Sequence, residues 1–157
     1  MKTIKGDILN PPEGTDAICI PTNGIVRANG ELVMGAGLAL AAKKKWPEIA
    51  RTLGVAVKRF GNGVHLMNTF QSKGQEVSKN EFCYVLSFPT KNHWRDKSSL
   101  ELITKSCEQL LAFVDKWGVK QVMLPVVGCG LGNLKWEEVE PILDKYLDDR
   151  FTVVFKK

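Results

Sequence analysis

The sequence lacks any long hydrophobic run. No apolar stretch approaches the roughly 20 residues that a helix needs to cross a bilayer, and the opening residues Met1 to Asp7 lack the apolar core of a secretory signal peptide. These absences argue against a membrane protein and favour a cytoplasmic one. Internal repeats, low-complexity segments and linkers are also missing, so we expect residues 1–157 to form a single domain.

Metal-site spacing is missing as well. None of the four cysteines forms a C-x-x-C pair, and the two histidines, His65 and His93, lie far in sequence from three of the cysteines. Structural zinc sites draw their ligands from closely spaced pairs, so we expect neither a metal site nor a cofactor. Cys19, Cys83 and Cys107 sit within apolar patterns, which predicts small buried side chains.

Two common nucleotide-binding motifs are absent. The Walker motif needs Gly-Lys-Ser/Thr, and the Rossmann fingerprint needs a third glycine where this sequence has Leu40 or Asn133. The net charge of +5 nevertheless favours an anionic partner, such as a nucleotide, a nucleic acid or a phosphorylated ligand. The run Lys43 to Lys45 adds to this charge, although it also fits the solvated face of a helix.

Strand-like and helix-like segments alternate along the chain, as judged from the spacing of apolar residues. The predicted strands are 3–9, 16–20, 64–69, 82–88, 121–127 and 151–155, and the polar stretch 71–80 separates two of them. The predicted helices are 35–46, a short one with Pro47 in its first turn, one from Ser98 to Gly118, and 136–147. Ser98 and Glu101 form an S-x-x-E capping box. The alternation predicts a largely parallel sheet covered by helices, with ligands at the carboxyl ends of the strands.

Two glycine-rich loops stand where such a ligand would bind. Residues 33–38 run directly into a predicted helix, and residues 125–133 join a predicted strand to the next helix. Glycine lets backbone amides approach an anion closely, and a helix N-terminus adds a favourable dipole. Two such loops can hold a pyrophosphate from both sides, although a single loop of this kind also serves merely to pack a strand against a helix.

Two further features carry ionisable groups. Lys91 follows a predicted strand within a dense polar and aromatic cluster that includes Thr90, His93 and Trp94, so it is either an active-site lysine or a solvated loop residue. Asp7 follows the first strand, where its carboxylate either accepts a hydrogen bond from the exocyclic amine of a base or simply ends the strand in a turn.

Four motifs occur in the order typical of macrodomains, which bind ADP-ribose. They are Gly6-Asp7-Ile8, Asn23 after the second strand, Met34-Gly35-Ala36-Gly37-Leu38-Ala39, and Gly128-Cys129-Gly130-Leu131-Gly132 before Trp136-Glu137-Glu138-Val139. The chain thus resembles a macrodomain over nearly its whole length. The resemblance implies a three-layer α/β/α fold with a mixed, largely parallel sheet. It implies that Asp7 contacts the adenine amine and that the two glycine loops hold the diphosphate and the distal ribose. The residues expected to bind substrate are Asp7, Ile8, Asn23, Met34, Gly35, Ala36, Gly37, Leu38, Thr90, Val127, Gly128, Cys129, Gly130, Leu131 and Gly132.

Residues 88–94, Phe-Pro-Thr-Lys-x-His-Trp, resemble one branch of the macrodomains. That branch contains the terminal ADP-ribose protein glycohydrolases and the DarG antitoxins, which remove ADP-ribose from thymidine in DNA. Lys91 matches its catalytic lysine. The protein glycohydrolases carry an aspartate where this sequence has Gly132, and the glycine is closer to the DarG pattern. A longer segment, Ile25 to Leu32, is a second difference and is expected to reshape the entrance on the distal-ribose side.

These features support one leading hypothesis and three alternatives. The leading hypothesis is a mono-ADP-ribosyl hydrolase that uses Lys91, as a neutral nucleophile or as a charged stabiliser, on a modified macromolecule such as nucleic acid. The alternatives are a non-catalytic ADP-ribose reader, a phosphatase acting on ADP-ribose 1″-phosphate, and a general nucleic-acid-binding module. Scattered lysines disfavour the last of these. We expect a monomer with no membrane partner.

Overall fold

Strands and helices alternate along residues 1–67 and 83–157, which the computed structural model describes. In chain order they are β1 (Lys2–Gly6), β2 (Ala17–Thr22), α1 (Gly37–Lys45), α2 (Ile49–Phe60), β3 (Tyr84–Pro89), α3 (Leu100–Trp117), β4 (Val122–Pro125), α4 (Trp136–Tyr146) and β5 (Phe151–Lys156). The polar stretch 71–80 lies outside the described residues. Among those residues, no helix combines the length and hydrophobicity that crossing a membrane requires.

The strands form one sheet in the order β1-β5-β4-β2-β3, and every neighbouring pair is parallel. The inner strands read as continuous apolar runs because helices cover both of their faces. In β2, for example, Ala17 to Ile20 are fully buried. β1 is an edge strand, and most of its residues are exposed. The predicted largely parallel sheet is therefore confirmed.

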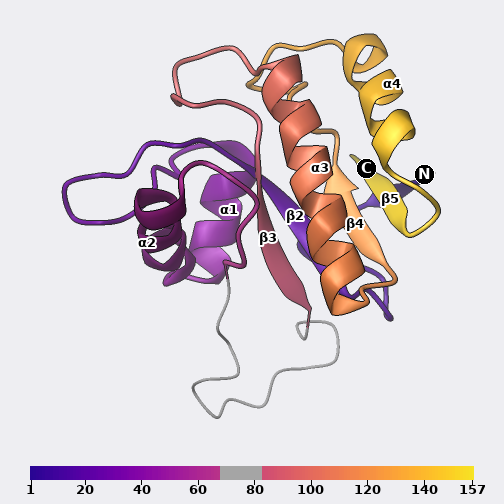
Figure 1. The fold of residues 1–157 in the computed structure, drawn as a ribbon, viewed down its shortest axis with the longest axis horizontal. Coiled ribbons are helices and arrows are strands. Elements are labelled where there is room, and N and C mark those ends of the chain that lie inside the picture. Colours follow the sequence, from indigo (N-terminus) through magenta and orange to yellow (C-terminus); the bar gives the residue numbers. More distant parts are fainter. Residues whose placement is uncertain (68–82) are drawn as a thin grey trace.

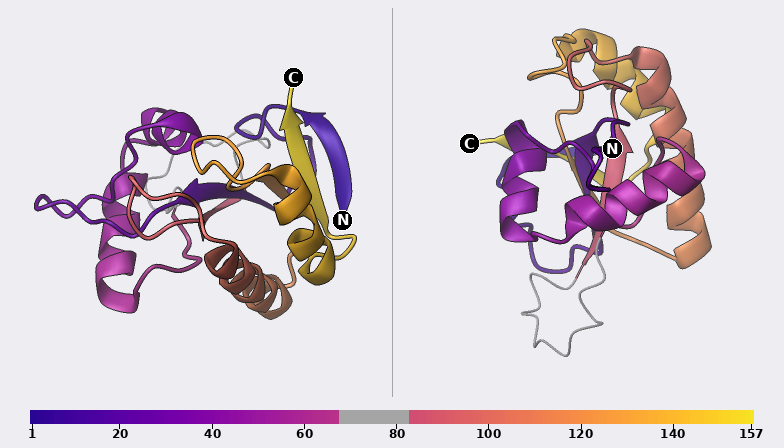
Figure 2. Two further views of the ribbon diagram at one scale, coloured as in Figure 1. Left: turned by 90° about the horizontal axis from the view of Figure 1, so that it is seen from above. Right: turned by 90° about the vertical axis from the view of Figure 1, so that its left-hand side faces the viewer.

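Alternate strand residues enter two separate hydrophobic cores. Cys19 and Val153 face a core formed with α3 and α4. Ile18 and Val154 face a second core that includes buried residues of α1 and α2. Figure 2 shows the sheet between these layers, with α2 lying beside the β3 edge. The expected three-layer arrangement is thus present. Cys19 and Cys107 are buried as predicted, and Cys83 is half-buried.

The N-terminus of α3 differs from its prediction. Ser99, not Ser98, is the N-cap residue, and its Oγ accepts a hydrogen bond from the amide of Leu102 at 3.2 Å. The backbone amide of Ser98 instead donates to the carbonyl of Gly132 at 2.9 Å, which ties Ser98 to the loop before α4. The far end of α3 is as predicted, since Gly118 adopts the left-handed conformation with φ +64°.

Two other predicted elements have different limits. The strand expected at 64–69 is reduced, within the described residues, to one antiparallel bridge between Leu66 and Leu86 beside β3. Residues 68 and 69 lie outside the described part. Pro47 precedes α2 rather than standing in its first turn, because Glu48 is the N-cap residue. Neither change moves the strand ends that carry the candidate site.

Candidate active site

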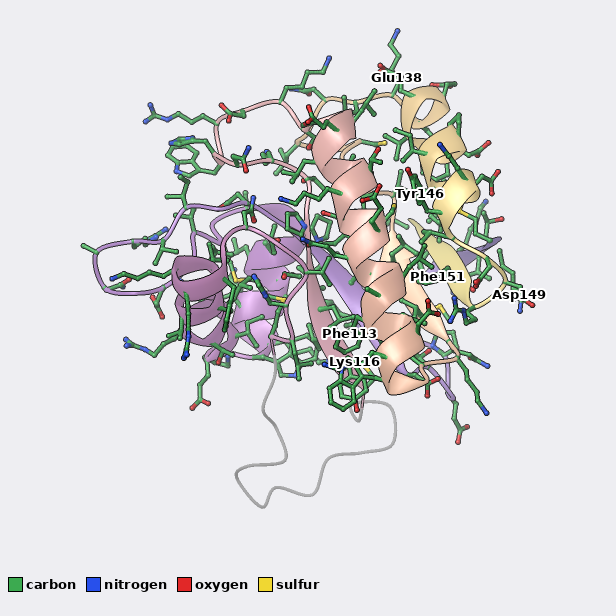
Figure 3. All side chains as sticks on the ribbon, viewed as in Figure 1. Phe113, Lys116, Glu138, Tyr146, Asp149 and Phe151 are labelled. Atoms are coloured by element: carbon green, nitrogen blue, oxygen red, sulfur yellow. The ribbon has the colours of Figure 1, made fainter. Side chains whose placement is uncertain are left out.

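The predicted site residues follow the carboxyl ends of the strands. Asp7 follows β1, the loop of Gly128 follows β4, Asn23 follows β2, and Thr90 follows β3. Parallel strands bring these ends to one edge of the sheet, and the segments that follow β3 and β4 are seen at the top of Figure 1. Figure 3 marks the same end of the molecule with Glu138 on α4, whereas Phe113 and Lys116 mark the opposite end of α3. Neighbouring strands lie about 4.8 Å apart, so four steps from β1 to β3 span about 19 Å.

The two glycine loops meet at this edge. A β-carbon placed on Gly37 would lie 3.4 Å from the Leu131 side chain, so the loops are in contact. β-Carbons on Gly35 or Gly130 would meet no atom within 4 Å, which leaves these backbones open. Ala36, the N-cap residue of α1, has no side-chain cap. The amides at this helix start therefore suit an incoming anion.

The loop from Gly128 to Gly132 contains two tightly packed glycines. Gly128 has φ +76°, and a β-carbon on it would lie 2.9 Å from the Ile103 side chain. Gly132 is buried, and a β-carbon there would overlap both the Ser98 hydroxyl and the Gly128 carbonyl oxygen. Position 132 thus has no room for an aspartate side chain while Ser98 stays in place. Asn133 follows with φ +62°, a conformation that glycine usually supplies.

Lys91 is half-buried and lies in an ordered turn after β3. Its Nζ donates to the carbonyl of Trp94 at 3.3 Å. The preceding residue, Thr90, is buried and connects two strand ends, because its amide donates to the carbonyl of Thr22 at 3.1 Å. The ammonium is thus held at the carboxyl end of β3, beside the end of β2.

Asn62 supports this turn and was not predicted from the sequence. Its Nδ2 donates to the carbonyl of Lys91 and to the side-chain oxygen of Asn92, both at 3.1 Å. The amide of Gly24 donates to the carbonyl of Asn92 at 2.9 Å. The only signal in the sequence is the pattern Gly61-Asn62-Gly63, which by itself reads as a plain turn.

Asn23 is buried, and both ends of its side-chain amide bind the backbone of the next segment. Nδ2 donates to the carbonyl of Val33 at 2.9 Å, and Oδ1 accepts from the amide of Ile25 at 3.0 Å. Residues 25–33 form a hairpin-like projection closed by an antiparallel bridge between Val26 and Leu32. Figure 2 shows it extending from the body of the molecule. Asn23 therefore positions the base of this projection.

Asp7 lies at the β1 end of the edge and is exposed. Its Oδ1 accepts a hydrogen bond from the amide of Leu9 at 3.0 Å, the one hydrogen bond of this carboxylate within the described residues. Ile8 is buried beside it. The carboxylate is thus fixed by the turn while it remains open to a ligand.

The Cys129 thiol lies in the second glycine loop but is a poor nucleophile. Partial burial raises its pKa, and the negative charges of Glu137 and Glu138 raise it further. The thiol donates to the carbonyl of Val127 at 3.4 Å.

No group of three or more His, Cys, Asp or Glu side chains in residues 1–67 and 83–157 is arranged to hold a metal ion. Met34 and Val127 are buried under the loops and shape them from below.

Comparison with known proteins gives consistent matches. The family model described as Macro domain matches residues 26–143. The ADP-ribose glycohydrolase OARD1 of Bos taurus is 31% identical over 156 residues, which cover 96% of this chain and 88% of that protein. The DNA ADP-ribosyl glycohydrolase of Mycobacterium tuberculosis is 33% identical over 108 residues, which cover 69% of this chain. The match spans only 30% of the length of that relative.

A solved structure extends the likeness to the fold. The macrodomain of Mycobacterium tuberculosis DarG superimposes with a TM-score of 0.74 at 27% identity. The superposition covers 98% of this chain and 95% of that domain. The similarity therefore includes the whole arrangement of sheet and helices, with the strand ends that carry the site.

Proposed function

The chain belongs to the macro domain family, and we propose on this basis that it binds ADP-ribose and hydrolyses the bond joining ADP-ribose to a modified nucleic acid. The observation that carries the proposal is the order of groups along the sheet edge. A carboxylate, Asp7, stands at the β1 end, the glycine loops lie at β4 and β2, and Lys91 stands at β3. ADP-ribose presents a base, a diphosphate and a distal ribose in the same order.

The glycine loops suit the diphosphate. Its two negative charges need donors that approach closely, and backbone amides beside Gly35 and Gly130 have open space in front of them. The uncapped start of α1 adds the positive end of a helix dipole. Binding of the diphosphate therefore needs no lysine, which leaves Lys91 for the chemical step.

Lys91 is the group that acts at the distal ribose in this proposal. The bond from the anomeric carbon to the acceptor breaks, water supplies the new hydroxyl, and the acceptor leaves with a proton. A neutral lysine amine can attack the ribose as a nucleophile, and a charged one can stabilise the developing charge. The hydrogen bond to the Trp94 carbonyl and the Asn62 support fix where the amine acts.

Nucleic acid is the proposed acceptor for two reasons. The aspartate of the protein-directed branch has no space at position 132, because Gly132 packs against Ser98 and its own loop. The net charge of +5 favours a polyanionic substrate. The name of the mycobacterial relative, a DNA ADP-ribosyl glycohydrolase, agrees with this choice, whereas that of the bovine relative specifies no acceptor.

The test is product release from three substrates side by side: ADP-ribosylated single-stranded DNA, ADP-ribosylated protein and ADP-ribose 1″-phosphate. We expect release of ADP-ribose mainly from the DNA. Lys91→Ala should lower that rate by a factor of about 10² or more while ADP-ribose still binds. Lys91→Arg keeps the charge but not a usable nucleophile, so partial activity would indicate an electrostatic role and none would indicate attack.

The outcomes separate the alternatives. Binding of ADP-ribose without release from any substrate would make the protein a reader, and phosphate release alone would make it a phosphatase. A clear preference for modified protein would overturn the acceptor assignment, and full activity of Lys91→Ala would overturn the role of the lysine. Lys116→Ala is the control, since Lys116 is an exposed lysine near the far end of α3 (Figure 3) and has no place in the proposed chemistry.

A further inference from the structure

An exposed tryptophan stands beside the proposed catalytic lysine. Trp94 keeps 45% of its surface exposed, although a side chain of this size normally contributes most when buried. Its ring stacks on that of His93, with centroids 5.2 Å apart and planes inclined by 29°. The guanidinium carbon of Arg95 lies 4.6 Å from the centre of the same ring. Two stacked rings and a guanidinium group thus lie together in one cluster, which we call the 93–95 stack.

The turn that carries the 93–95 stack is held by hydrogen bonds. The amide of Arg95 donates to Nδ1 of His93 at 3.0 Å, and the amide of Asp96 donates to the His93 carbonyl at 3.0 Å. The Lys91 side chain also donates to the Trp94 carbonyl oxygen at 3.3 Å. The exposure of Trp94 is therefore not that of a loose loop, and a ligand stacking there loses little additional freedom of the protein.

The position of the stack relates it to the acceptor. Lys91 Nζ is 3.3 Å from the Trp94 carbonyl oxygen, so the proposed reacting amine and the stack belong to one turn. Since the acceptor is bonded to the anomeric carbon on which Lys91 acts, the rest of the acceptor must continue past this turn. The stack is therefore placed to contact what lies next to the modified group, beyond the ADP-ribose itself.

The chemistry of the stack fits a nucleobase. Every base has a flat π-face, which stacks on indole and imidazole rings and on guanidinium planes. Arg95 and Lys97 add two positive charges against the one acid, Asp96, which suits a phosphate backbone. A polypeptide acceptor offers no regular row of flat groups, so it would gain little from this surface.

We propose that the 93–95 stack binds a nucleobase adjacent to the ADP-ribosylated nucleotide of a single-stranded nucleic acid. The proposal rests on the proposed function for the identity of the bond that is cleaved, and it adds a second binding site outside the proposed ADP-ribose site. In this proposal Trp94 makes the protein prefer a modified oligonucleotide to an isolated modified nucleoside.

The first experiment measures kcat/KM for an ADP-ribosylated oligonucleotide and for the ADP-ribosylated nucleoside alone. The native protein should prefer the oligonucleotide, and Trp94→Ala should reduce the ratio of the two values about tenfold, a typical effect of losing one stacked base. Trp94→Phe should recover part of the ratio because it retains a flat ring. The backbone carbonyl that holds Lys91 remains in both variants.

Trp117→Ala provides the matched control. Trp117 is 58% exposed and has Lys116 5.3 Å from its ring centre, so it resembles Trp94 in chemistry. It ends α3, whose 18 residues place it about 27 Å from the helix start beside the site. The control should keep the native ratio. An unchanged ratio in Trp94→Ala, or an equal fall for oligonucleotide, nucleoside and modified protein, would overturn the proposal.

A second experiment needs no catalysis and so separates this proposal from the proposed function. An unmodified single-stranded oligonucleotide should quench the tryptophan fluorescence of the native protein, with a Kd that rises with salt. Trp94→Ala should raise that Kd about tenfold, whereas Lys91→Ala should still bind the oligonucleotide through the stack. Native protein that binds no oligonucleotide, or Trp94→Ala that binds equally well, would refute the stack as a base site.

Discussion

At the scale of single residues, the contact between Gly132 and Ser98 decides what the second glycine loop can contain. Gly132 has no side chain, and there is no space for one, because Ser98 and the Gly128 carbonyl oxygen occupy the position that a β-carbon would take. Gly130, two residues earlier, faces open space. The two glycines therefore serve different purposes: Gly130 opens the backbone to a ligand, whereas Gly132 permits close packing.

Gly132→Ala should accordingly lower the free energy of unfolding by about 1–3 kcal/mol, the usual range for overpacking. Gly130→Ala is the matched control and should change it by less than about 1 kcal/mol, since nothing obstructs its added methyl group. Urea unfolding measures both. Ser98→Gly combined with Gly132→Ala should recover part of the loss, because two of the overlapping atoms belong to Ser98. Equal losses for the two single alanine variants would contradict this packing.

At the scale of elements, α3 shows how neighbouring serines take different roles. Ser99 caps the helix through Leu102, whereas the buried hydroxyl of Ser98 has no hydrogen-bond partner among the described residues. Ser99→Ala should therefore destabilise the protein by about 1 kcal/mol. Ser98→Ala should have little effect or a small stabilising one, because it removes an unsatisfied polar group. The urea midpoints of the two variants give the comparison. A larger loss of stability for Ser98→Ala than for Ser99→Ala would support the capping box at Ser98 that the sequence predicts.

That difference indicates how far the sequence alone predicts this fold. The strand and helix order, the parallel sheet and the end of α3 at Gly118 follow from local patterns, because apolar spacing and glycine conformation are properties of short segments. The cap was misplaced because Ser98 and Ser99 both precede a helical pattern. Ser98 stays outside the helix because its amide donates to the carbonyl of Gly132, 34 positions away, and local sequence does not predict that contact. The support of Lys91 by Asn62 was missed for the same reason.

At the scale of the whole molecule, the proposed ligand connects parts that belong to different cores. Met34, below the first glycine loop, is in the core with α1 and α2, and Val127, below the second, is in the core with α3 and α4. A ligand held by both loops should stabilise the whole domain, since it binds only when the two layers are assembled on the sheet.

ADP-ribose at a hundred times its Kd should stabilise the native protein by about 2.7 kcal/mol. For a domain of this size each kcal/mol raises Tm by about 2–4 °C, so a shift of about 5–11 °C is expected in a thermal scan. Asp7→Ala should weaken binding by about 1–3 kcal/mol and shrink the shift at the same ligand concentration. Asp149→Ala is the control, because Asp149 is an exposed acid at the amino end of β5 (Figure 3). If ADP-ribose raises the Tm of Asp7→Ala as much as that of the native protein, the Asp7 carboxylate does not bind the base.

The pairing of β1 with β5 has a consequence for the order in which the protein matures during synthesis. Lys2 pairs with Thr152, so during synthesis β1 has no partner until about 150 further residues have been added. At about 5–20 residues per second, this wait lasts about 8–30 seconds. During that time β2, β3 and β4 can already assemble, whereas β1, which is mostly exposed at the sheet edge, joins last. Asp7 follows β1, so the end of the candidate site proposed to hold the base is completed only after the end that carries Lys91.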